Sequence, residues 1–335
     1  MSKPLKAIVT TVPFGSIDPK PVELMHKNGL EHVINPLGRK LRPEEVADVI
    51  KGFPIIIAGT EPITAKIMDA SPELKAICRV GIGLDSIDLV AARQRGIAVS
   101  YTPDGPSPAV AELTIGLIID QLRGVSRADR VIRAGNWNRI PGGRVSLSTI
   151  GIIGVGRIGG RLLNHLAGGF PGVRILANDV DPSVQESFRD FPSVKWVEKE
   201  TIYREADIVS LHAPLTPETI GLVGEAELAM MKRGSFIINT ARGGMIDETS
   251  LAASLSSDHL AGAAIDVFEE EPYKGPLAEI KNIVLTCHMG SMTRDCRARM
   301  EIEATEEAIR FAQGKDFLSP VPESEYELAD RLAGN

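Results

Sequence analysis

The sequence predicts an α/β protein with two domains, each built on a doubly wound parallel sheet. Short apolar runs rich in β-branched residues alternate with helical segments along most of the chain. The length of 335 residues is about that of two ordinary domains. The alternation is interrupted at Thr102–Pro108, where three prolines and one glycine fall within seven residues. We interpret that segment as a hinge between the two domains.

The first series of strands and helices precedes this hinge. Gly29 stands where a glycine ends a helix, and Pro43 suits a first helical position. Strands are expected at Ala7–Thr11, Pro54–Ala58, Ala76–Cys78 and Ala98–Ser100, with helices at Pro21–Asn28, Pro43–Ile50 and Ile87–Gln94.

A second series begins after the hinge. Ser107 and Pro108 resemble an N-cap and a first helical residue, and a polar stretch follows at Ala134–Ser148. A final helix is expected from Thr293 to Phe311, and the polar tail Ser319–Asn335 is expected to be loosely held. Strands are expected at Thr149–Ile153, Arg174–Asn178, Ile208–Leu211, Ser235–Asn239, Ala261–Asp266 and Asn282–Thr286.

Composition and charge exclude several classes of protein. Hydrophobic residues make up 43% of the chain, as in ordinary globular domains. The formal net charge is −7, whereas a general binder of nucleic acid or of an anionic membrane surface has a basic footprint, so neither partner is expected. Apolar runs such as Ile150–Val155 are far shorter than the roughly 18 residues of a transmembrane helix, and we expect no signal peptide. The cysteines (Cys78, Cys287 and Cys296) are too few for a disulfide scaffold, which favours the cytoplasm.

The segment Gly154–Gly159 matches the G-x-G-x-x-G pattern of a dinucleotide-binding turn. A predicted strand precedes it and the helical Arg157–Leu166 follows, which is the context that this pattern requires. Asp179, 25 residues after Gly154, can accept hydrogen bonds from ribose hydroxyls and repel a 2′-phosphate, so it favours NAD over NADP. Asp181 is a competing candidate, and a turn that binds no ligand is the alternative.

Polar side chains follow three further strands at the edge where α/β sheets bind ligands. Arg242 precedes two glycines and can bind a carboxylate through its planar fork. His288 is suited to move a hydroxyl proton near neutral pH, and an acid among Glu269–Glu271 can orient it. The alternatives without a catalytic role are a structural histidine at His288 and a solvent-exposed acidic surface at Glu269–Glu271.

The chain from Ala7 to Phe311 resembles the D-isomer-specific 2-hydroxyacid dehydrogenase family, which includes phosphoglycerate, glycerate and D-lactate dehydrogenases. The resemblance implies a Rossmann NAD-binding domain at 105–296 and a discontinuous, flavodoxin-like substrate domain at 1–104 and 297–335. The stretches that match are Arg79–Asp85, Val110–Leu113, Gly154–Gly159, His212–Thr219, Asn239–Asp247, Asp266–Pro272 and His288.

By this resemblance, Arg242 binds the substrate's carboxylate, Glu271 orients the histidine and His288 exchanges the proton. The loop residues Arg79, Val80 and Gly81 are the implied substrate contacts. The implied NAD contacts are Gly154, Gly156, Arg157, Ile158, Gly159, Asp179, His212, Pro214, Thr219, Thr240, Ala241, Asp266 and Gly290.

Some features depart from the family or stay open. Cys287 replaces the proline that usually precedes the catalytic histidine, and Glu271 separates the chain from formate dehydrogenases, which have glutamine there. No metal is expected, because Cys287, Cys296 and His288 lack a second ligand pair with zinc spacing. Trp137 matches an arm that packs across a dimer in the family, so a homodimer is expected. Because the chain ends soon after the final helix that the resemblance implies, we expect no regulatory domain of the kind that some relatives have.

The matching motifs are compatible with more than one substrate. By the resemblance, Gly59–Pro62 lies near the phosphate contacts of phosphoglycerate enzymes and Arg79 is a nearby cation, so a phosphoglycerate-like substrate is slightly favoured over glycerate or glyoxylate, although Glu61 would oppose a phosphate. The alternative from another functional class is a non-catalytic, NAD(H)-sensing protein like the corepressors of the same family.

Overall fold

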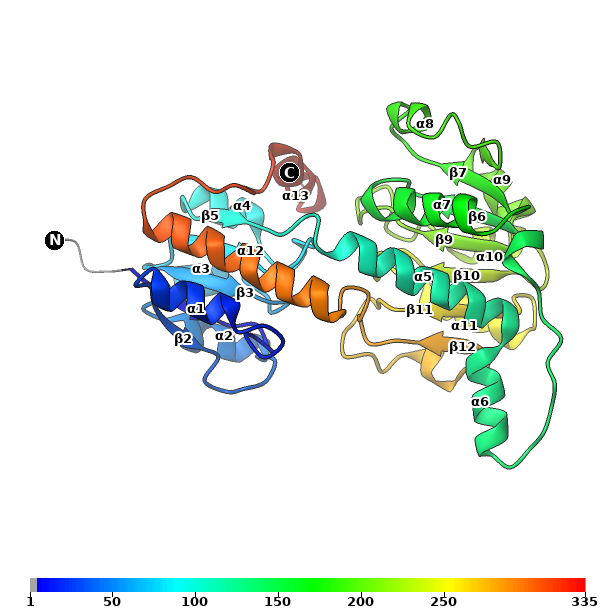
Figure 1. The fold of residues 1–335 in the computed structure, drawn as a ribbon, viewed down its shortest axis with the longest axis horizontal. Helices are drawn as coiled ribbons and strands as arrows, with labels where there is room; N and C mark the ends of the chain where they lie inside the picture. Colours follow the sequence, from blue (N-terminus) through cyan, green and yellow to red (C-terminus); the bar gives the residue numbers. More distant parts are fainter. Residues whose placement is uncertain (1–4, 335) are drawn as a thin grey trace. The chain divides into compact units, whose positions relative to one another are not determined.

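The computed structural model describes residues 5–334, which form two compact units (Figure 1). Unit 1 consists of residues 5–106 and 291–334, and unit 2 of residues 107–290. The domain boundaries expected from the sequence, between residues 104 and 105 and between residues 296 and 297, lie two and six residues from these unit boundaries. The expectations for the extreme N-terminus and for residue 335 lie outside the described residues. No helix in the described range has the length and apolar character needed to cross a membrane.

Unit 1 is a five-stranded parallel sheet with the order β2-β1-β3-β4-β5, the doubly wound order of flavodoxin. Its central strand is Ile-rich and buried on both faces, as parallel sheets require. The strands are β1 (Lys6–Val9), β2 (Glu31–Ile34), β3 (Ile55–Ala58), β4 (Ala76–Arg79) and β5 (Ala98–Ser100). The helices are α1 (Lys20–Lys27), α2 (Pro43–Ile50), α3 (Ala65–Asp69), α4 (Leu89–Gln94), α12 (Arg294–Ala312) and α13 (Glu323–Leu332).

The chain returns to unit 1 through α12, which packs on α1, β3 and β4 (Figure 1). The expectation of a loosely held tail is wrong, because α13 packs against α4. Tyr326 lies under the Arg93 guanidinium, whose carbon is 3.9 Å from the ring centroid, and Arg93 also pairs with Glu323.

Unit 2 is a seven-stranded parallel sheet with the order β12-β11-β10-β9-β6-β7-β8, which contains the Rossmann arrangement. The strands are β6 (Thr149–Ile153), β7 (Arg174–Asn178), β8 (Val194–Trp196), β9 (Ile208–Leu211), β10 (Phe236–Asn239), β11 (Gly262–Ile265) and β12 (Ile283–Leu285). The helices are α5 (Pro106–Arg123), α6 (Val125–Arg133), η1 (Val145–Leu147), α7 (Arg157–Gly169), α8 (Ser183–Glu186), α9 (Lys199–Glu205), α10 (Glu225–Met230), α11 (Glu248–Ser256) and η2 (Pro276–Glu279).

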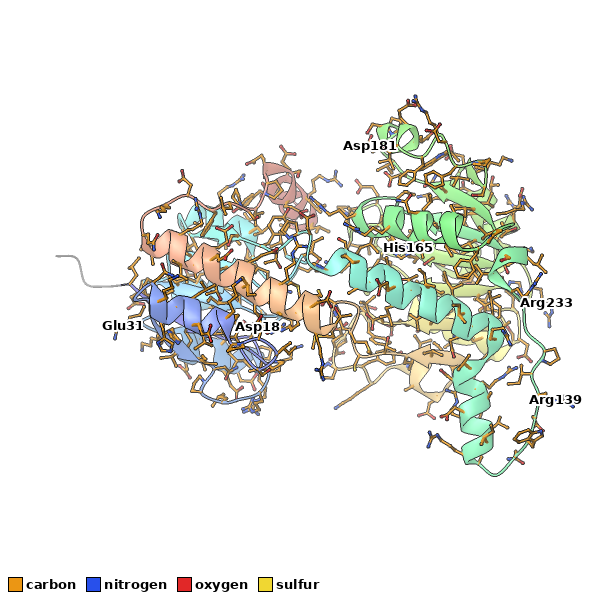
Figure 2. The ribbon with its side chains drawn as sticks, in the orientation of Figure 1. Asp18, Glu31, Arg139, His165, Asp181 and Arg233 are labelled. Carbon is orange, nitrogen blue, oxygen red and sulfur yellow. The ribbon has the colours of Figure 1, made fainter. Side chains whose placement is uncertain are left out.

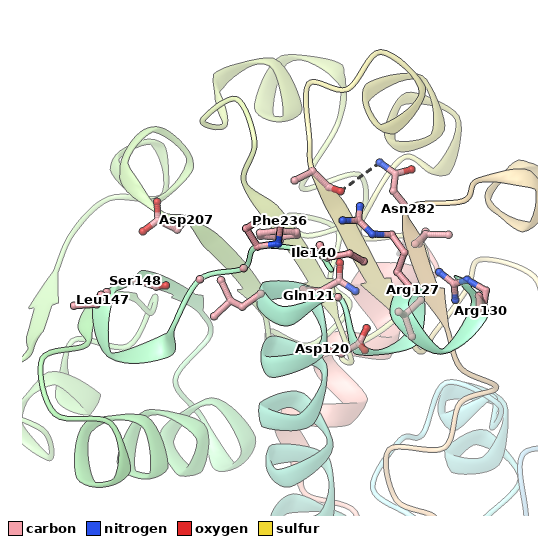
Figure 3. A pocket seen from close by; sticks show the side chains of 18 residues that line it. Asp120, Gln121, Arg127, Arg130, Ile140, Leu147, Ser148, Asp207, Phe236 and Asn282 are labelled. Atoms are coloured by element: carbon pink, nitrogen blue, oxygen red, sulfur yellow. Dashed lines mark hydrogen bonds between the residues drawn. The ribbon is translucent and has the colours of Figure 1, made fainter. Parts of the chain in front are cut away.

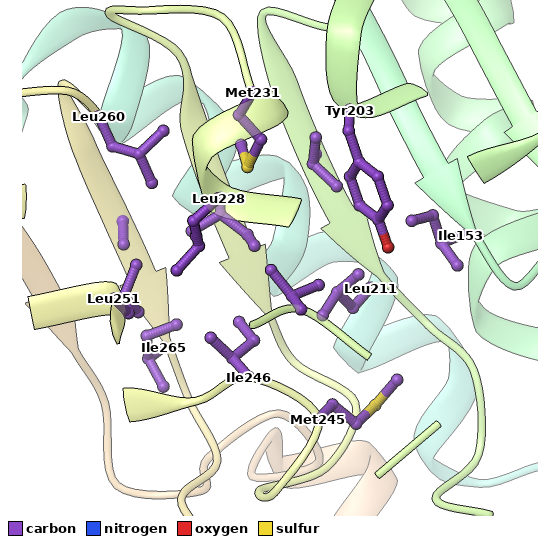
Figure 4. Close-up of a cluster of buried hydrophobic side chains, with 14 of the residues drawn as sticks. Ile153, Tyr203, Leu211, Leu228, Met231, Met245, Ile246, Leu251, Leu260 and Ile265 are labelled. Carbon is purple, nitrogen blue, oxygen red and sulfur yellow. The ribbon is translucent and has the colours of Figure 1, made fainter. Parts of the chain in front are cut away.

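Both faces of the unit 2 sheet are covered by apolar side chains. Figure 4 shows one of these clusters, in which Leu211 and Ile265 from the sheet meet Leu228, Ile246 and other residues of the covering segments. Burying each such side chain contributes roughly 1.5–3 kcal/mol relative to exposure. The packed side chains hold the sheet in place, and the ends of its strands determine where the loops begin.

Two local expectations differ from the structure. Ser107 is not an N-cap, because α5 already begins at Pro106 and the buried Ser107 hydroxyl has no hydrogen-bond partner. The strands β2 and β8 were not expected, because neither carries a long apolar run. Both are edge strands, where one side of the strand stays unpaired and polar residues are tolerated.

Candidate functional site

The glycine pattern forms a tight turn between β6 and α7, and two of its glycines are required by the surrounding backbone. Gly154 has φ of +88°, and a Cβ there would lie 2.5 Å from the amide nitrogen of Ala213. A Cβ on Gly159 would lie 2.0 Å from the carbonyl oxygen of Gly154. By contrast, a Cβ on Gly156 would meet nothing within 4 Å. Open space therefore lies at the N-terminus of α7, where a phosphate is favoured.

Asp179 lies beside this turn, at the end of β7. One carboxylate oxygen accepts the Val155 amide at 2.6 Å, and the other accepts the Asp181 amide at 2.9 Å. Each oxygen keeps a further lone pair that can accept a ribose hydroxyl. The competing candidate Asp181 is exposed and lies next to α8 (Figure 2). Asp179 is the acid fixed against the glycine turn.

The loop after β9 completes this edge. Ser210 and Nε2 of His212 are 2.8 Å apart, and the buried Nδ1 of His212 has no partner within the described residues. Burial lowers the pKa of His212 to about 4, so the imidazole is neutral at neutral pH. The Thr219 hydroxyl donates to the Pro214 carbonyl at 2.7 Å and accepts the Thr216 amide, so it shapes the loop itself. The glycine turn, the acid and the orphaned nitrogen fit a bound dinucleotide.

Arg242, Glu271 and His288 come from three loops of unit 2, and His288 contacts Glu271 directly. Nδ1 of His288 lies 3.0 Å from each oxygen of the Glu271 carboxylate. The side chains of His288 and Glu271 are 44% and 29% exposed, so the pair is open to a ligand. Because the carboxylate only accepts hydrogen bonds, it holds the proton on Nδ1 and leaves Nε2 to exchange a proton.

The arginine loop is packed directly against the loop that leads to Glu271. A Cβ on Gly243 would lie 1.9 Å from the Phe268 carbonyl oxygen, so only glycine fits. Nη1 of Arg242 donates to the Ala241 carbonyl at 2.7 Å. The side chain of Asn239 closes the turn by donating to the Arg242 carbonyl and accepting the Ala241 amide. Sequence reasoning assigned no role to Asn239, and an amide at a strand end before Arg-Gly-Gly was the available signal.

A buried carboxylate holds the histidine loop. Oδ1 of Asp266 accepts the Thr286 hydroxyl at 2.6 Å and the Met289 amide at 2.9 Å, and Oδ2 accepts the Gly290 amide at 2.9 Å. These bonds surround His288, whose φ of +50° is uncommon outside glycine. Because Asp266 is only 1% exposed, the hydrogen bonds described for its carboxylate come from groups of the histidine loop itself. Sequence reasoning gave Thr286 no role.

Other implied contacts are already engaged within their units. The hydroxyls of Thr240 and Thr114 are 3.0 Å apart and buried. In unit 1, the Val80 amide donates to the Ala58 carbonyl and the Gly81 amide donates to the Thr102 hydroxyl. An anion at this loop would therefore use amides other than these two.

No group of three or more His, Cys, Asp or Glu side chains in residues 5–334 is arranged to hold a metal ion. All three cysteines are free, with Cys287 exposed and the other two buried. The cavity that Figure 3 shows has a volume of about 500 Å³ and lies at the opposite, amino edge of the unit 2 sheet. It is lined by Asp120, Arg127, Phe236 and Asn282 among others, and is remote from the loops described above.

Comparison with known proteins identifies relatives over most of the chain. Residues 115–290 match the family model "D-isomer specific 2-hydroxyacid dehydrogenase, NAD binding domain". A glyoxylate reductase of Thermofilum pendens is 38% identical over 264 residues, covering 76% of this chain and 77% of that protein. A D-3-phosphoglycerate dehydrogenase of Archaeoglobus fulgidus is 33% identical over 302 residues, covering 89% of this chain but 56% of that protein. The solved structure of the TT0316 protein from Thermus thermophilus is 33% identical, with a TM-score of 0.85 over 95% of this chain and 100% of that one.

Proposed function

Because the chain belongs to the D-isomer-specific 2-hydroxyacid dehydrogenase family, we propose that it uses Arg242, Glu271 and His288 to interconvert a small D-2-hydroxy acid and its 2-keto acid. It is an NAD-dependent oxidoreductase that acts on a CH–OH group. The single observation that carries the residue assignment is the pair of 3.0 Å contacts between His288 Nδ1 and Glu271.

His288 moves the proton in this proposal. In reduction, Nε2 donates a proton to the substrate oxygen as the carbonyl becomes a hydroxyl, and in oxidation it accepts that proton. Glu271 keeps the proton on Nδ1 and stabilises the imidazolium form that the donor needs. By microscopic reversibility, the nitrogen that donates the proton in reduction accepts it in oxidation.

Arg242 binds the substrate. Its guanidinium can hold the substrate carboxylate in a bidentate pair and polarise the neighbouring carbonyl oxygen. The bond from Nη1 to the Ala241 carbonyl restrains the side chain before substrate binds, which reduces the entropy lost on binding.

NAD would be held by the glycine turn, by the ribose-binding Asp179 and by the loop around His212, with Thr240 and Gly290 as further proposed contacts. When bound, the cofactor supplies or accepts the hydride. The carboxylate of Asp179 would repel the 2′-phosphate of NADP, which favours NAD.

The test is the His288→Ala variant assayed with NADH and hydroxypyruvate or glyoxylate. Loss of the proton donor should lower turnover by at least 100-fold, while NADH binding, followed by its fluorescence, stays within about twofold. Glu271→Gln should lower turnover less, because an amide still bonds Nδ1 but does not stabilise imidazolium. Normal turnover in His288→Ala refutes the assignment. Tight NADH binding without turnover on any 2-keto acid would instead favour the NAD(H)-sensing alternative.

We also propose a homodimer formed through unit 2. Trp137 is 81% exposed, and Val125 and Ile132 of α6 are 56% and 57% exposed, which is much apolar surface for one short segment. A second copy of this chain would cover that surface, and C₂ dimers are the commonest oligomers. Sedimentation velocity should give a dimer for the parent and a weakened one for Trp137→Ala. A monomeric parent contradicts the proposal.

A cytoplasmic location remains a proposal, supported by three cysteines that are all free.

A further inference from the structure

We propose that Thr286 is a positioning residue for the proton transfer at His288, and that it acts through the hydrogen bond from its hydroxyl to Asp266. This inference rests on the proposed function and adds a residue to it. It concerns unit 2 alone, because every residue in the argument lies between 107 and 290.

The register of two neighbouring strands places Thr286 beside Asp266. Strands β11 and β12 are parallel, and Ile265 is paired with Leu285 at their carboxyl ends. The next residues along the two strands are Asp266 and Thr286. The Thr286 amide donates to the Ile265 carbonyl at 3.0 Å, and the Thr286 hydroxyl donates to Oδ1 of Asp266 at 2.6 Å. The sheet itself therefore brings a hydroxyl donor to the carboxylate.

Asp266 anchors the histidine loop through three consecutive amides. The His288 amide donates to the backbone carbonyl of Asp266 at 2.8 Å. The Met289 amide donates to Oδ1 and the Gly290 amide to Oδ2, each at 2.9 Å. A residue other than glycine keeps a φ of +50°, as His288 does, only where its surroundings hold it. The three bonds to Asp266 hold the backbone on both sides of this residue.

Asp266 also begins the loop that carries Glu271. Glu271 lies five residues after Asp266, and its Oε1 accepts the Phe268 amide at 3.3 Å. Nδ1 of His288 lies 3.0 Å from both oxygens of Glu271. Asp266 thus holds one partner of the pair through the chain and the other through hydrogen bonds. A rotation of its carboxylate would move His288 relative to Glu271.

The Thr286 hydroxyl fixes the orientation of this carboxylate. Its bond to Oδ1 has the length of a charge-assisted O–H···O⁻ hydrogen bond, which is the stronger kind. Asp266 is buried, so a donor that is lost from its carboxylate leaves an acceptor poorly satisfied. The carboxylate would then turn toward other donors and take the Met289 and Gly290 amides with it. The hydroxyl therefore keeps the imidazole at its contact with Glu271.

Thr286→Val tests the role of the hydroxyl, because valine has nearly the same shape. With hydroxypyruvate and saturating NADH, kcat should fall by about tenfold, since a misplacement of about 1 Å can cost about 100-fold. KM for the keto acid should stay within about twofold, because Asn239 closes the Arg242 loop separately. The solvent deuterium isotope effect on kcat should rise, because the proton transfer becomes slower. A merely structural role would lower stability without this division between kcat and KM.

Thr286→Ser is the rescue variant and Ser148→Ala is the matched control. Serine keeps the hydroxyl, so kcat should stay within about twofold of the wild-type value. Ser148 is buried directly before β6, at the amino edge of the same sheet, and donates to the Arg144 carbonyl at 2.9 Å. Removing that hydroxyl should leave kcat unchanged, and a loss equal to that of Thr286→Val would overturn the inference.

The outcomes separate the inference from the function on which it rests. A folded Thr286→Val protein with wild-type kcat, or equal losses in Thr286→Val and Thr286→Ser, overturns the inference and leaves the proposed function intact. Absence of turnover by the wild-type protein on every 2-keto acid refutes the proposed function itself, and the inference with it.

Hydrogen exchange gives a readout that does not depend on activity. The Met289 and Gly290 amides donate to the Asp266 carboxylate, so their exchange should be at least about tenfold faster in Thr286→Val and near wild type in Thr286→Ser. Mass spectrometry of a peptide that contains residues 286–290 measures this rate. Thr286→Ala, which also lacks the hydroxyl, replaces the valine variant if that protein does not fold. Unchanged exchange in a folded variant without the hydroxyl overturns the inference.

Discussion

Replacing Gly243 by alanine should separate two loops of the active site without touching a side chain that does chemistry. The added Cβ would lie 1.9 Å from the carbonyl oxygen of Phe268 and 2.6 Å from the Glu269 amide nitrogen. An ordinary contact begins at 3.4 Å, so one backbone must move by about 1.5 Å. That movement displaces Arg242 relative to Glu271, because Arg242 directly precedes Gly243 and Glu271 lies three residues after Phe268.

A displacement of about 1 Å can cost about 100-fold in rate, so kcat/KM for hydroxypyruvate should fall by that factor in Gly243→Ala. The free energy of unfolding should fall by about 1–3 kcal/mol through overpacking. NADH affinity, measured by fluorescence titration, should fall much less than kcat/KM, because the dinucleotide turn belongs to β6 and α7 and Asp179 follows β7, whereas Thr240 is the proposed NAD contact that lies close to Gly243.

The matched control is Gly116→Ala. Gly116 is exposed within α5, and a Cβ there would meet nothing within 4 Å. This variant should keep full activity and gain about 0.5–1 kcal/mol in stability, because alanine has the higher helix propensity. A folded Gly243→Ala protein with wild-type kcat/KM would refute the argument that this contact positions the site.

Three further outcomes follow from the structure. Asp179→Ser should raise kcat/KM for NADPH relative to NADH by about tenfold, measured with one 2-keto acid, because the carboxylate that repels a 2′-phosphate is gone; an unchanged ratio contradicts the role of Asp179. Burial lowers the pKa of His212 to about 4, so between pH 6.5 and 4 this imidazole is protonated in the unfolded chain but neutral in the folded protein. The contribution of His212 to the free energy of unfolding is therefore fully present above pH 6.5 and falls by up to about 3 kcal/mol as the pH approaches 4. Urea unfolding of His212→Asn should show a smaller fall over the same pH range. Ellman's reagent at pH 8 should label Cys287 rapidly in the folded protein and Cys78 and Cys296 only on unfolding, because burial raises the pKa of the latter two to about 12 and 11; fast labelling of three thiols would contradict the burial.

Strong local patterns located most of the sheet. The predicted strands Thr149–Ile153, Arg174–Asn178 and Ile208–Leu211 have the observed bounds, because each is a buried apolar run between turn residues. The helix α13 was missed because its residues are polar, and its stability comes from packing on α4 and from the contact between Tyr326 and Arg93. Such contacts join residues far apart in sequence, so the local composition of the helix does not indicate them.

The sequence by itself determined the dinucleotide turn, since the positive φ at Gly154 and the close approach at Gly159 restrict those positions to glycine. It also provided an arginine, a histidine and three adjacent glutamates at strand ends. The residue pattern alone left open which glutamate contacts His288, and the family resemblance implied Glu271. The contact itself depends on the tertiary structure, because two loops far apart in sequence must meet in one register. The tertiary structure likewise decided that Arg79 donates to its own loop, because a side chain's partners depend on what the fold places within hydrogen-bond distance.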